Sequence, residues 1–271
     1  MDFRLMCNKY VLLLVLAIQF HSLSASELSV RHLLCEHMVN PLGVDIPIPG
    51  LSWKIYSEDT QVLQTAYRII VSENIEQLRN DVGVYWDSEK VISDNSIQVF
   101  YEGVPLKPAK TYYWKVKVWD NRGRESEWSE ISLWKMGLVS SADWGKAKWI
   151  TFQDSLKEQR LVPGIHSPGS DELGDMRNVL PYFRKEFEIK KKLKSATAYV
   201  SGLGHFEMSL NGRKVGNHFL DPGWTNYDKY ALYLAFDVLP YLSEGDNACG
   251  IMLGNGFYHT PRERYRKCTI S

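Results

Sequence analysis

The stretch Tyr112–Trp119, YYWKVKVW, decides the fold of the first half of this 271-residue chain. Every second residue from Trp114 is apolar, whereas Lys115 and Lys117 occupy the positions between. Side chains of a β-strand point alternately to opposite faces, so this period of two places apolar groups inside and lysines outside. The four residues that follow, DNRG, have the composition of a tight turn. The stretch therefore predicts a strand that covers a core on one face and ends in a turn.

Similar short stretches surround this strand and extend from about Leu28 to Leu138. They are rich in β-branched and aromatic residues and are separated by turn residues. Only Asn74–Asp81 (NIEQLRND) has the pattern of a helix. About 110 residues of evenly spaced strands fit one β-sandwich. Trp53 and the stretch Glu127–Ser129 resemble a fibronectin type III-like domain, and we expect such aromatic residues to pack rather than to bind a ligand. The other predicted strands here are Leu51–Tyr56, Ala66–Ser72 and Ile97–Tyr101.

A small and polar stretch at Leu138–Ala142 predicts a boundary between two domains, residues 27–138 and 139–271. A polar insert without periodicity, Gln153–Leu180, comes next, and it is either a functional loop or a solvated excursion. Strands then resume, so the whole chain is expected to be all-β. The predicted strands are Pro181–Ile189, Ser195–Gly202, His205–Leu210, Tyr230–Phe236 and Cys249–Leu253.

The last residues, Arg262–Ser271, alternate like a strand and have no polar tail after them. A strand that stops in this way predicts a second domain that is truncated at its C-terminus. The expected architecture is therefore one sandwich followed by a second, incomplete one.

The first 26 residues have the pattern of a secretory signal peptide. Arg4 and Lys9 precede or flank the apolar run Tyr10–Phe20, and small residues follow it. The run is too short to span a bilayer, which takes about 20 apolar residues. We expect a secreted or periplasmic protein with no membrane span after signal removal, and an uncleaved N-terminal anchor is the alternative.

Charge and cysteine content limit the partners of the chain. The 32 basic and 32 acidic residues cancel, which argues against nucleic acid as a partner. If Cys7 leaves with the signal, then Cys35, Cys249 and Cys268 remain, an odd number. A bridge between Cys249 and Cys268 and a pair of isolated thiols both stay open. No zinc-type spacing is present among the seven His residues.

Carboxylates are the candidate catalytic groups, because the sequence has no nucleotide-binding glycine pattern, no GxSxG elbow and no cysteine nucleophile with a matched histidine. Glycoside hydrolysis uses two carboxyl groups that flank the scissile bond. The acidic residues available in the second half are Glu186, Glu207, Asp221 and Asp228.

A sugar-binding surface is the more specific hypothesis for the second half. Glu207 shares a strand face with Ser209 and Asn211, and a loop carrying Asp221, Trp224 and Asp228 follows. Sugars need planar hydrogen-bonding groups for their hydroxyls and an aromatic surface for their C–H faces. The alternative is structural: Glu207 and Asn211 cap turns, and Trp224 fills the domain core.

Four stretches in fixed order resemble the N-terminal region of bacterial α-L-rhamnosidases. They are Tyr199–Glu207 (YVSGLGHFE), Leu210–Gly216 (LNGRKVG), Leu220–Tyr227 (LDPGWTNY) and Leu253–Tyr258 (LGNGFY). The upstream stretches CEHMVNPLGVDIP, LSWKI, TAYRIIV, WDSEKV and YYWKVKVWD are also similar to that family, so the resemblance covers about Glu27–Lys267.

The resemblance implies a fibronectin-like domain, a galactose-binding-like jelly roll and then a helical (α/α) barrel. In the family, that barrel carries the general-acid Glu and the second carboxylate for inverting hydrolysis of terminal α-L-rhamnose, and no residue of this chain matches either. We therefore expect the chain alone to be inactive. Residues in the recurrent motifs of the jelly roll are Asn211, Asp221, Trp224, Asp228 and Asn255. With Glu207 they form the expected carbohydrate-binding set. No cofactor is implied, and calcium is left open because some members bind rhamnose with calcium through a related module.

Three functional hypotheses follow. The first is a non-catalytic N-terminal portion of an exported α-L-rhamnosidase, whose partners are a rhamnose-containing glycan and the catalytic barrel of the full-length protein. The second is a stand-alone carbohydrate-binding protein. The third is a structural spacer. For Gly212, Gly216, Gly254 and Gly256, tight turns at strand ends are the expected role.

Overall fold

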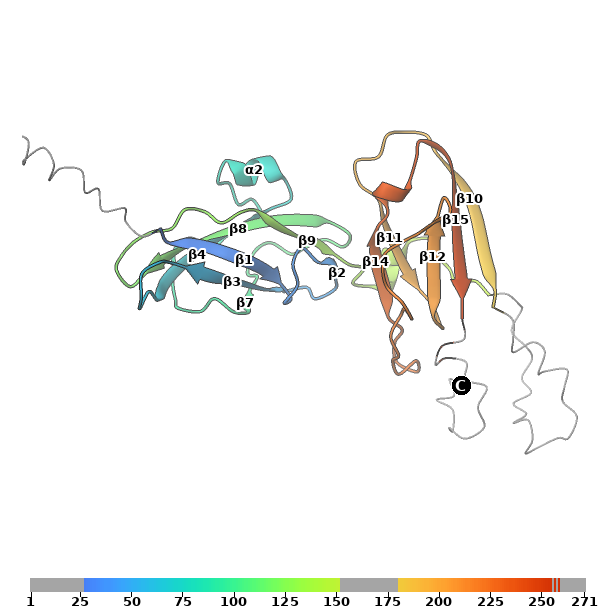
Figure 1. Ribbon diagram of the computed structural model, residues 1–271, viewed down its shortest axis with the longest axis horizontal. Coiled ribbons are helices and arrows are strands. Elements are labelled where there is room, and N and C mark those ends of the chain that lie inside the picture. The colour runs from blue at the N-terminus through green and yellow to red at the C-terminus, as the bar shows by residue number, and fades with distance from the viewer. Residues whose placement is uncertain (1–26, 152–179, 255, 257, 259–271) are drawn as a thin grey trace, which may run out of the picture. The chain divides into compact units, whose positions relative to one another are not determined.

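The computed structural model describes residues 27–151, 180–254, 256 and 258. Within these residues one compact unit ends at Met136 and a second begins at Gly137 (Figure 1). Both units are built from β-strands, which confirms the all-β prediction. The predicted strand at Arg262–Ser271 and nearly all of the polar insert lie outside the described residues. No helix among the described residues has the length and hydrophobicity to cross a membrane.

The first unit is a sandwich of two sheets. The smaller sheet has the strand order β1-β3-β7, and the larger has the order β2-β9-β8-β4-β5, with β6 also paired to β4. The strands of the smaller sheet are β1 (Ser29–Cys35), β3 (Gly50–Tyr56) and β7 (Val99–Phe100). Those of the larger sheet are β2 (Leu42–Val44), β4 (Gln64–Ser72), β5 (Trp86–Asp87), β6 (Val91–Ile92), β8 (Thr111–Asp120) and β9 (Ser132–Met136).

The stretch that decided the sequence interpretation is β8, in the middle of the larger sheet. Its apolar residues Trp114, Val116 and Val118 are fully buried, as the period of two predicts. They lie opposite Val71, Ile69 and Tyr67 of β4, in antiparallel register. The apolar faces of two neighbouring strands therefore cover the same core.

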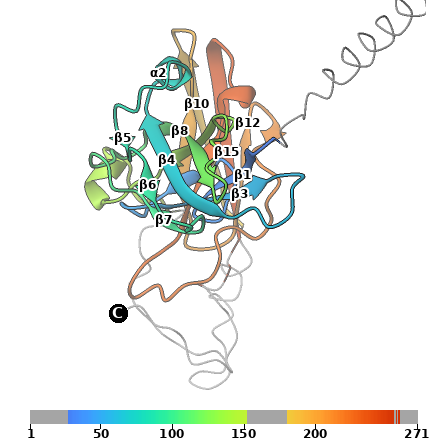
Figure 2. The same cartoon turned by 90° about the vertical axis from the view of Figure 1, so that its left-hand side faces the viewer.

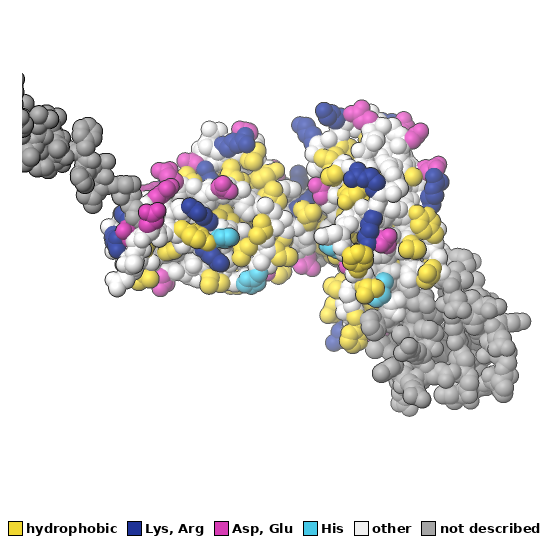
Figure 3. Space-filling view, in the orientation of Figure 1, with side chains coloured by type: hydrophobic (Ala, Val, Ile, Leu, Met, Phe, Trp, Pro, Cys, Tyr) yellow, Lys and Arg dark blue, Asp and Glu magenta, His cyan; other side chains and the backbone are white. Residues whose placement is uncertain are grey.

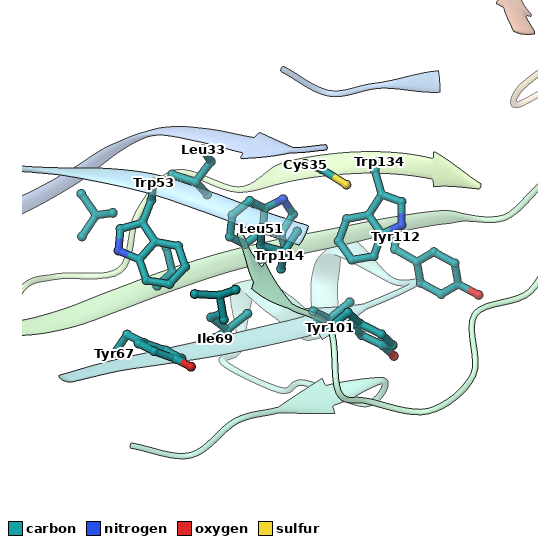
Figure 4. Close-up of a cluster of buried hydrophobic side chains, with 14 of the residues drawn as sticks. Leu33, Cys35, Leu51, Trp53, Tyr67, Ile69, Tyr101, Tyr112, Trp114 and Trp134 are labelled. Atoms are coloured by element: carbon teal, nitrogen blue, oxygen red, sulfur yellow. The ribbon is translucent and has the colours of Figure 1, made fainter. Parts of the chain in front are cut away.

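The aromatic residues fill that core, as expected. Trp53, Trp114 and Trp134 are among the largest buried side chains of the chain (Figure 4). The indole Nε1–H of Trp53 donates to Gln64 Oε1 over 2.9 Å, so its polar edge is satisfied inside the sandwich. Trp53 also packs edge-to-face on Tyr67, with ring centroids 5.3 Å apart.

The lysine face of β8 differs from the expectation at one position. The side chain of Lys115 is only 7% exposed, although a lysine was expected in solvent. Its ammonium lies 4.9 Å from the ring centroid of Trp128 and forms an ion pair with Asp81. Lys117 lies 5.0 Å from the same ring. The indole of Trp128 therefore lies against both ammonium groups, a contact that the periodicity of a single strand does not predict.

Two serines hold the segment that carries Trp128 against β8. The backbone N–H of Val116 donates to Ser129 Oγ over 3.1 Å, and the N–H of Val118 donates to Ser126 Oγ over 3.0 Å. These side chains take the place of a neighbouring strand along this part of β8. The segment at Glu127–Ser129 thus packs against β8.

The one predicted helix is present and short. Helix α2 spans Ile75–Arg79 inside the predicted Asn74–Asp81, and it stands outside the sandwich in both views (Figures 1 and 2). Asn74 caps it by accepting the Glu76 N–H over 2.9 Å. Leu78 is its buried residue, which attaches the helix to the sheet.

The second unit has one sheet of four strands and one of two. The order in the first is β10-β15-β12-β13, and β11 pairs with β14 in the second. The core between them includes Phe206, Met208 and Leu210 of β12 together with Phe236. The elements are 3₁₀ helix η1 (Ser141–Trp144), β10 (Tyr182–Ile189), β11 (Thr197–Ser201), β12 (Phe206–Leu210), β13 (Arg213–Lys214), β14 (Tyr233–Asp237), 3₁₀ helix η2 (Leu239–Tyr241) and β15 (Gly245–Leu253).

The DNRG turn after β8 is organised by a buried carboxylate. Asp120 accepts the backbone N–H groups of Arg122 and Arg124, each over 2.9 Å, and the Arg124 guanidinium over 2.7 Å. Burial alone would raise the pKa of Asp120, but the hydrogen bonds from the Arg124 backbone and side chain and from the Arg122 backbone outweigh it and lower the pKa. The turn therefore depends on an ionised side chain.

Shortening a buried side chain of β4 tests the core. Ile69→Val should lower the free energy of unfolding of the first unit by about 0.5–1.5 kcal/mol, because a buried methylene is lost. The matched control is Ile92→Val in β6, where the side chain is 79% exposed and the change should stay within about 0.5 kcal/mol. Urea denaturation of both variants measures the difference, and equal effects at the two positions would contradict the assigned core.

The carboxylate in the DNRG turn predicts a pH dependence. A depressed folded-state pKa contributes stability that is present above the unfolded pKa and is lost as pH falls through the folded pKa. Asp120→Asn should therefore reduce the stability of the first unit at pH 6, and the gap from the wild type should narrow below about pH 4. Denaturation curves at pH 6 and pH 3 give the comparison. A gap that widens in acid would show that Asp120 is not held ionised by the turn.

Candidate functional site

Glu207 lies on the outer face of the four-stranded sheet. Its neighbours Phe206 and Met208 are buried, so β12 alternates as the sequence predicted. The Glu207 carboxylate accepts a hydrogen bond from Lys214 Nζ over 2.6 Å. That ammonium also lies 4.0 Å from the ring centroid of Phe219. Glu207 thus belongs to a surface ion pair rather than to a turn cap.

Asn211 has a structural role in the turn between β12 and β13. Its Nδ2 donates to the carbonyl oxygen of Tyr241 over 2.9 Å and to Asn247 Oδ1 over 2.8 Å. Its Oδ1 accepts the N–H of Ala248 over 2.9 Å. Its backbone has φ +51°, a left-handed conformation that Asn tolerates. The side chain therefore ties the turn to two other segments, and few of its hydrogen-bonding groups are left for a ligand.

The loop from 217 to 232 carries the remaining predicted residues. Asp221 Oδ2 lies 3.1 Å from His218 Nδ1, and its carbonyl oxygen accepts the N–H of Phe206 over 2.7 Å. Trp224 is 63% exposed, so it does not fill the domain core. Asp228 is also exposed. Figure 3 shows hydrophobic side chains gathered on this loop, below β14, and the exposed ones are Phe219, Leu220, Trp224, Tyr230 and Leu232.

The structure does not gather these residues into one site. Asp221 is joined to the first residue of β12, Phe206, whereas Asn211 follows its last residue. At about 3.3 Å per residue, the two ends of this strand are separated by roughly 15 Å. Glu207 and Asp221 lie at one end, and Asn211 lies at the other. Asn255 is outside the described residues.

Glycines of the recurrent motifs have the expected structural role. Gly212 and Gly216 have φ of +77° and +74°, a region that favours glycine. At Gly256, a Cβ would lie 2.9 Å from the Cα of Gly204, so the two backbones approach too closely for a side chain. The glycine in LGNGFY therefore allows strand ends to meet.

The described residues do not fit a metal site made of side chains. No group of three or more His, Cys, Asp or Glu lies together in ranges 27–151 and 180–254. Of the two acidic residues of the loop, Asp221 faces His218 and Asp228 is exposed. The described part of the chain thus contains no cluster of side chains that would support the expectation of a calcium site.

The cysteines that the structure describes are thiols. Cys35 is buried, and burial together with the nearby Glu36 charge raises its pKa to about 12. Burial also raises the pKa of Cys249. Cys35 and Cys249 form no bridge with each other, and Cys268 lies outside the described residues. A protonated thiol is a poor nucleophile, so neither residue is a candidate catalytic group.

Sequence reasoning missed the neighbours of Glu207 across the sheet. Met252 of β15 lies directly opposite Glu207, and Tyr182 of β10 lies opposite Met252. All three side chains therefore project from the outer face. The alternation in YFRKEFEI placed Tyr182 on the polar side of its strand, but only the strand order β10-β15-β12 brings it near Glu207.

Two family models match the two halves of the chain. The model described as "Rha78A-like, N-terminal immunoglobulin domain" matches residues 30–140, and the "Alpha-L-rhamnosidase N-terminal domain" matches residues 191–270. The second range includes β11 through β15 and the loop with Trp224. This chain carries the N-terminal domain pair of the α-L-rhamnosidases.

Most of this chain aligns with part of the sequence of much longer α-L-rhamnosidases. An α-L-rhamnosidase of Formosa agariphila is 41% identical over 221 residues, which are 81% of this chain and 23% of that protein. An α-L-rhamnosidase of Streptomyces avermitilis is 32% identical over 85% of this chain and 22% of that protein. The chain therefore spans about a quarter of the length of the rhamnosidases that it matches.

Solved rhamnosidase structures have the same fold over this region. The α-L-rhamnosidase from Dictyoglumus thermophilum superposes with a TM-score of 0.73 and 40% identity, over 84% of this chain and 25% of that one. The native enzyme from Aspergillus terreus gives a TM-score of 0.68 and 26% identity, over 85% of this chain and 24% of that one. The resemblance given by the sequence motifs is thus confirmed.

Removing the Asn211 side chain tests its role in this rhamnosidase domain. Asn211→Ala should destabilise the second unit by about 1–3 kcal/mol, because the Ala248 N–H and the Tyr241 carbonyl oxygen lose their hydrogen bonds to Asn211, and the buried Asn247 loses one of its partners. The matched control is Asn217→Ala at an exposed position, with a change within about 0.5 kcal/mol. Thermal unfolding followed by circular dichroism measures both. Wild-type stability in Asn211→Ala would instead return this residue to the candidates for ligand binding.

Proposed function

We propose that this chain is the non-catalytic N-terminal portion of an exported α-L-rhamnosidase, a longer protein whose hydrolytic barrel removes terminal α-L-rhamnose from glycans or glycosides. The observation that carries the proposal is the matching of both domains, in order, to whole rhamnosidases at up to 41% identity. Export is supported by the signal-like pattern of the first 26 residues.

The placement of the carboxylates supports a non-catalytic role. Glycoside hydrolysis needs two carboxyl groups on either side of one scissile bond. Here Glu186 pairs with Arg184 at 2.6 Å, Glu207 pairs with Lys214 at 2.6 Å, and Asp221 faces His218. Each of these three acidic groups lies beside a basic one. Catalysis is therefore assigned to the barrel that the family adds to these domains.

The role of the β-domains is to support that barrel and to extend its hold on the substrate. Loop 217–232 gives the support a structural basis, because five large hydrophobic side chains there are exposed in the described unit. Exposed apolar groups of this kind are common where a second domain packs. A stand-alone carbohydrate-binding protein is the alternative function, and the exposed indole of Trp224 is the observation that favours it.

An activity assay on two proteins tests the proposal. The protein encoded by the whole reading frame should be recovered outside the cytoplasm and should release aryl alcohol from an aryl α-L-rhamnoside. The chain of Glu27–Ser271 alone should give no release, with or without calcium, because it lacks a pair of catalytic carboxyl groups.

Two controls make the assay decisive. An aryl β-D-glucoside should remain intact with both proteins, which shows that release depends on rhamnose. Robust release by the short chain would place catalysis in the β-domains and overturn the non-catalytic assignment. A full-length protein that is exported but leaves every rhamnoside intact would overturn the enzymatic one.

A further inference from the structure

We propose that the outer face of the sheet β10-β15-β12-β13 is a binding platform for a neutral sugar, with the ring of Tyr182 as its stacking surface. The inference rests on the proposed function only for the choice of sugar, a rhamnose-bearing glycan. The surface is centred on Tyr182, Gly250 and Ser209, and is distinct from the loop with Trp224.

The strand register brings the platform together from three strands. Tyr182, Met252 and Glu207 form one row across the sheet. Arg184, Gly250 and Ser209 form the next row. Residues directly opposite each other in antiparallel strands project from the same face, so both rows point away from the core. Lys214 of β13 lies opposite Ser209 and extends the second row.

The absence of a side chain at Gly250 lets the hydroxyl end of the Tyr182 ring lie over the central strand. A Cβ at Gly250 would lie 2.8 Å from Cζ of Tyr182, and it would overlap the tyrosine hydroxyl. The hydroxyl reaches Ser209 Oγ on β12 at 3.5 Å, so the ring crosses the central strand. Tyr182 is nevertheless 60% exposed. The hydroxyl end of the ring therefore covers Gly250 while much of the residue stays in solvent.

Polar groups lie beside the aromatic surface, as a sugar requires. Glu207 and Lys214 form their ion pair at 2.6 Å with half to two-thirds of each side chain covered, and both keep unused hydrogen-bonding groups. Ser209 contributes a hydroxyl next to the tyrosine hydroxyl. An apolar ring bordered by a carboxylate, an ammonium and a hydroxyl fits the alternating C–H and O–H surface of a pyranose.

The charges on the face favour a neutral ligand. Each basic group of the two rows has an acidic partner, since Arg184 pairs with Glu186 and Lys214 pairs with Glu207, both at 2.6 Å. A phosphate or an acidic sugar would have to compete with these carboxylates. Rhamnose is uncharged and has a methyl group in place of a hydroxymethyl group. The exposed thioether of Met252, beside Tyr182, supplies an apolar contact for such a methyl.

Titration of the full chain with methyl α-L-rhamnopyranoside tests the platform. Saturation-transfer NMR should show the sugar in contact with aromatic protons, and the dissociation constant should rise at least about tenfold in Tyr182→Ala. Tyr182→Phe keeps the ring and loses only a hydroxyl at 3.5 Å from Ser209, so its affinity should stay within about twofold of the wild type. The matched control is Phe100→Ala in the first unit, an aromatic residue with 57% exposure, which should bind normally.

Thermal unfolding of each variant separates binding from folding, because Tyr182 is 60% exposed and the second unit of Tyr182→Ala should stay folded at the temperature of the titration. No saturable binding by the wild-type chain, or unchanged affinity in Tyr182→Ala, overturns the platform. Loss of binding in Trp224→Ala with full binding in Tyr182→Ala also overturns it, and assigns the sugar to the loop. These outcomes do not depend on hydrolysis by the full-length protein, so the platform and the proposed function can fail separately.

Discussion

The antiparallel pairing of β8 with β4 is the constraint on which the first unit depends. It aligns the buried faces of two long strands over one core. It also determines which residues of β8 lie on the opposite face of the sheet. There the lysines of β8 have to share space with Trp128, and the serines beside that indole complete the hydrogen bonding of β8. The burial of Lys115 is thus a consequence of the register rather than an exception to it.

The same rule shapes the outer face of the second unit. Because Phe206, Met208 and Leu210 enter the core, Glu207 and Ser209 have to face outward. The position of β15 between β10 and β12 then decides which outward residues become neighbours. A polar face on a single strand becomes a surface with an aromatic component only after this strand order is in place.

Local pattern was enough to predict the β-rich elements, the one helix and the family. In each case a few adjacent residues are enough to indicate the local structure, as in YYWKVKVW, NIEQLRND and the glycine motifs. The site residues were harder to predict, because their contacts join residues that are far apart in the sequence. Asn211 is hydrogen-bonded to Tyr241 and Ala248, and Tyr182 reaches Ser209 across an intervening strand. Spacing along the chain contains none of these contacts. Asn211 and Asp221 belong to one expected carbohydrate-binding set, but they lie at opposite ends of β12.

Gly250 affects both the stability of the sheet and the entropy lost when a ligand binds. A glycine inside a strand weakens the sheet by roughly 0.5–1 kcal/mol relative to alanine, because it gains order on folding without adding a side chain. Because Gly250 has no side chain, the hydroxyl end of the Tyr182 ring is already positioned over the strand before a ligand binds. Fixing a free side chain during association costs about 0.5–1.5 kcal/mol, and a ring placed in advance avoids much of that entropy loss. Gly250 therefore lowers the stability of the sheet slightly and at the same time preorganises its outer surface.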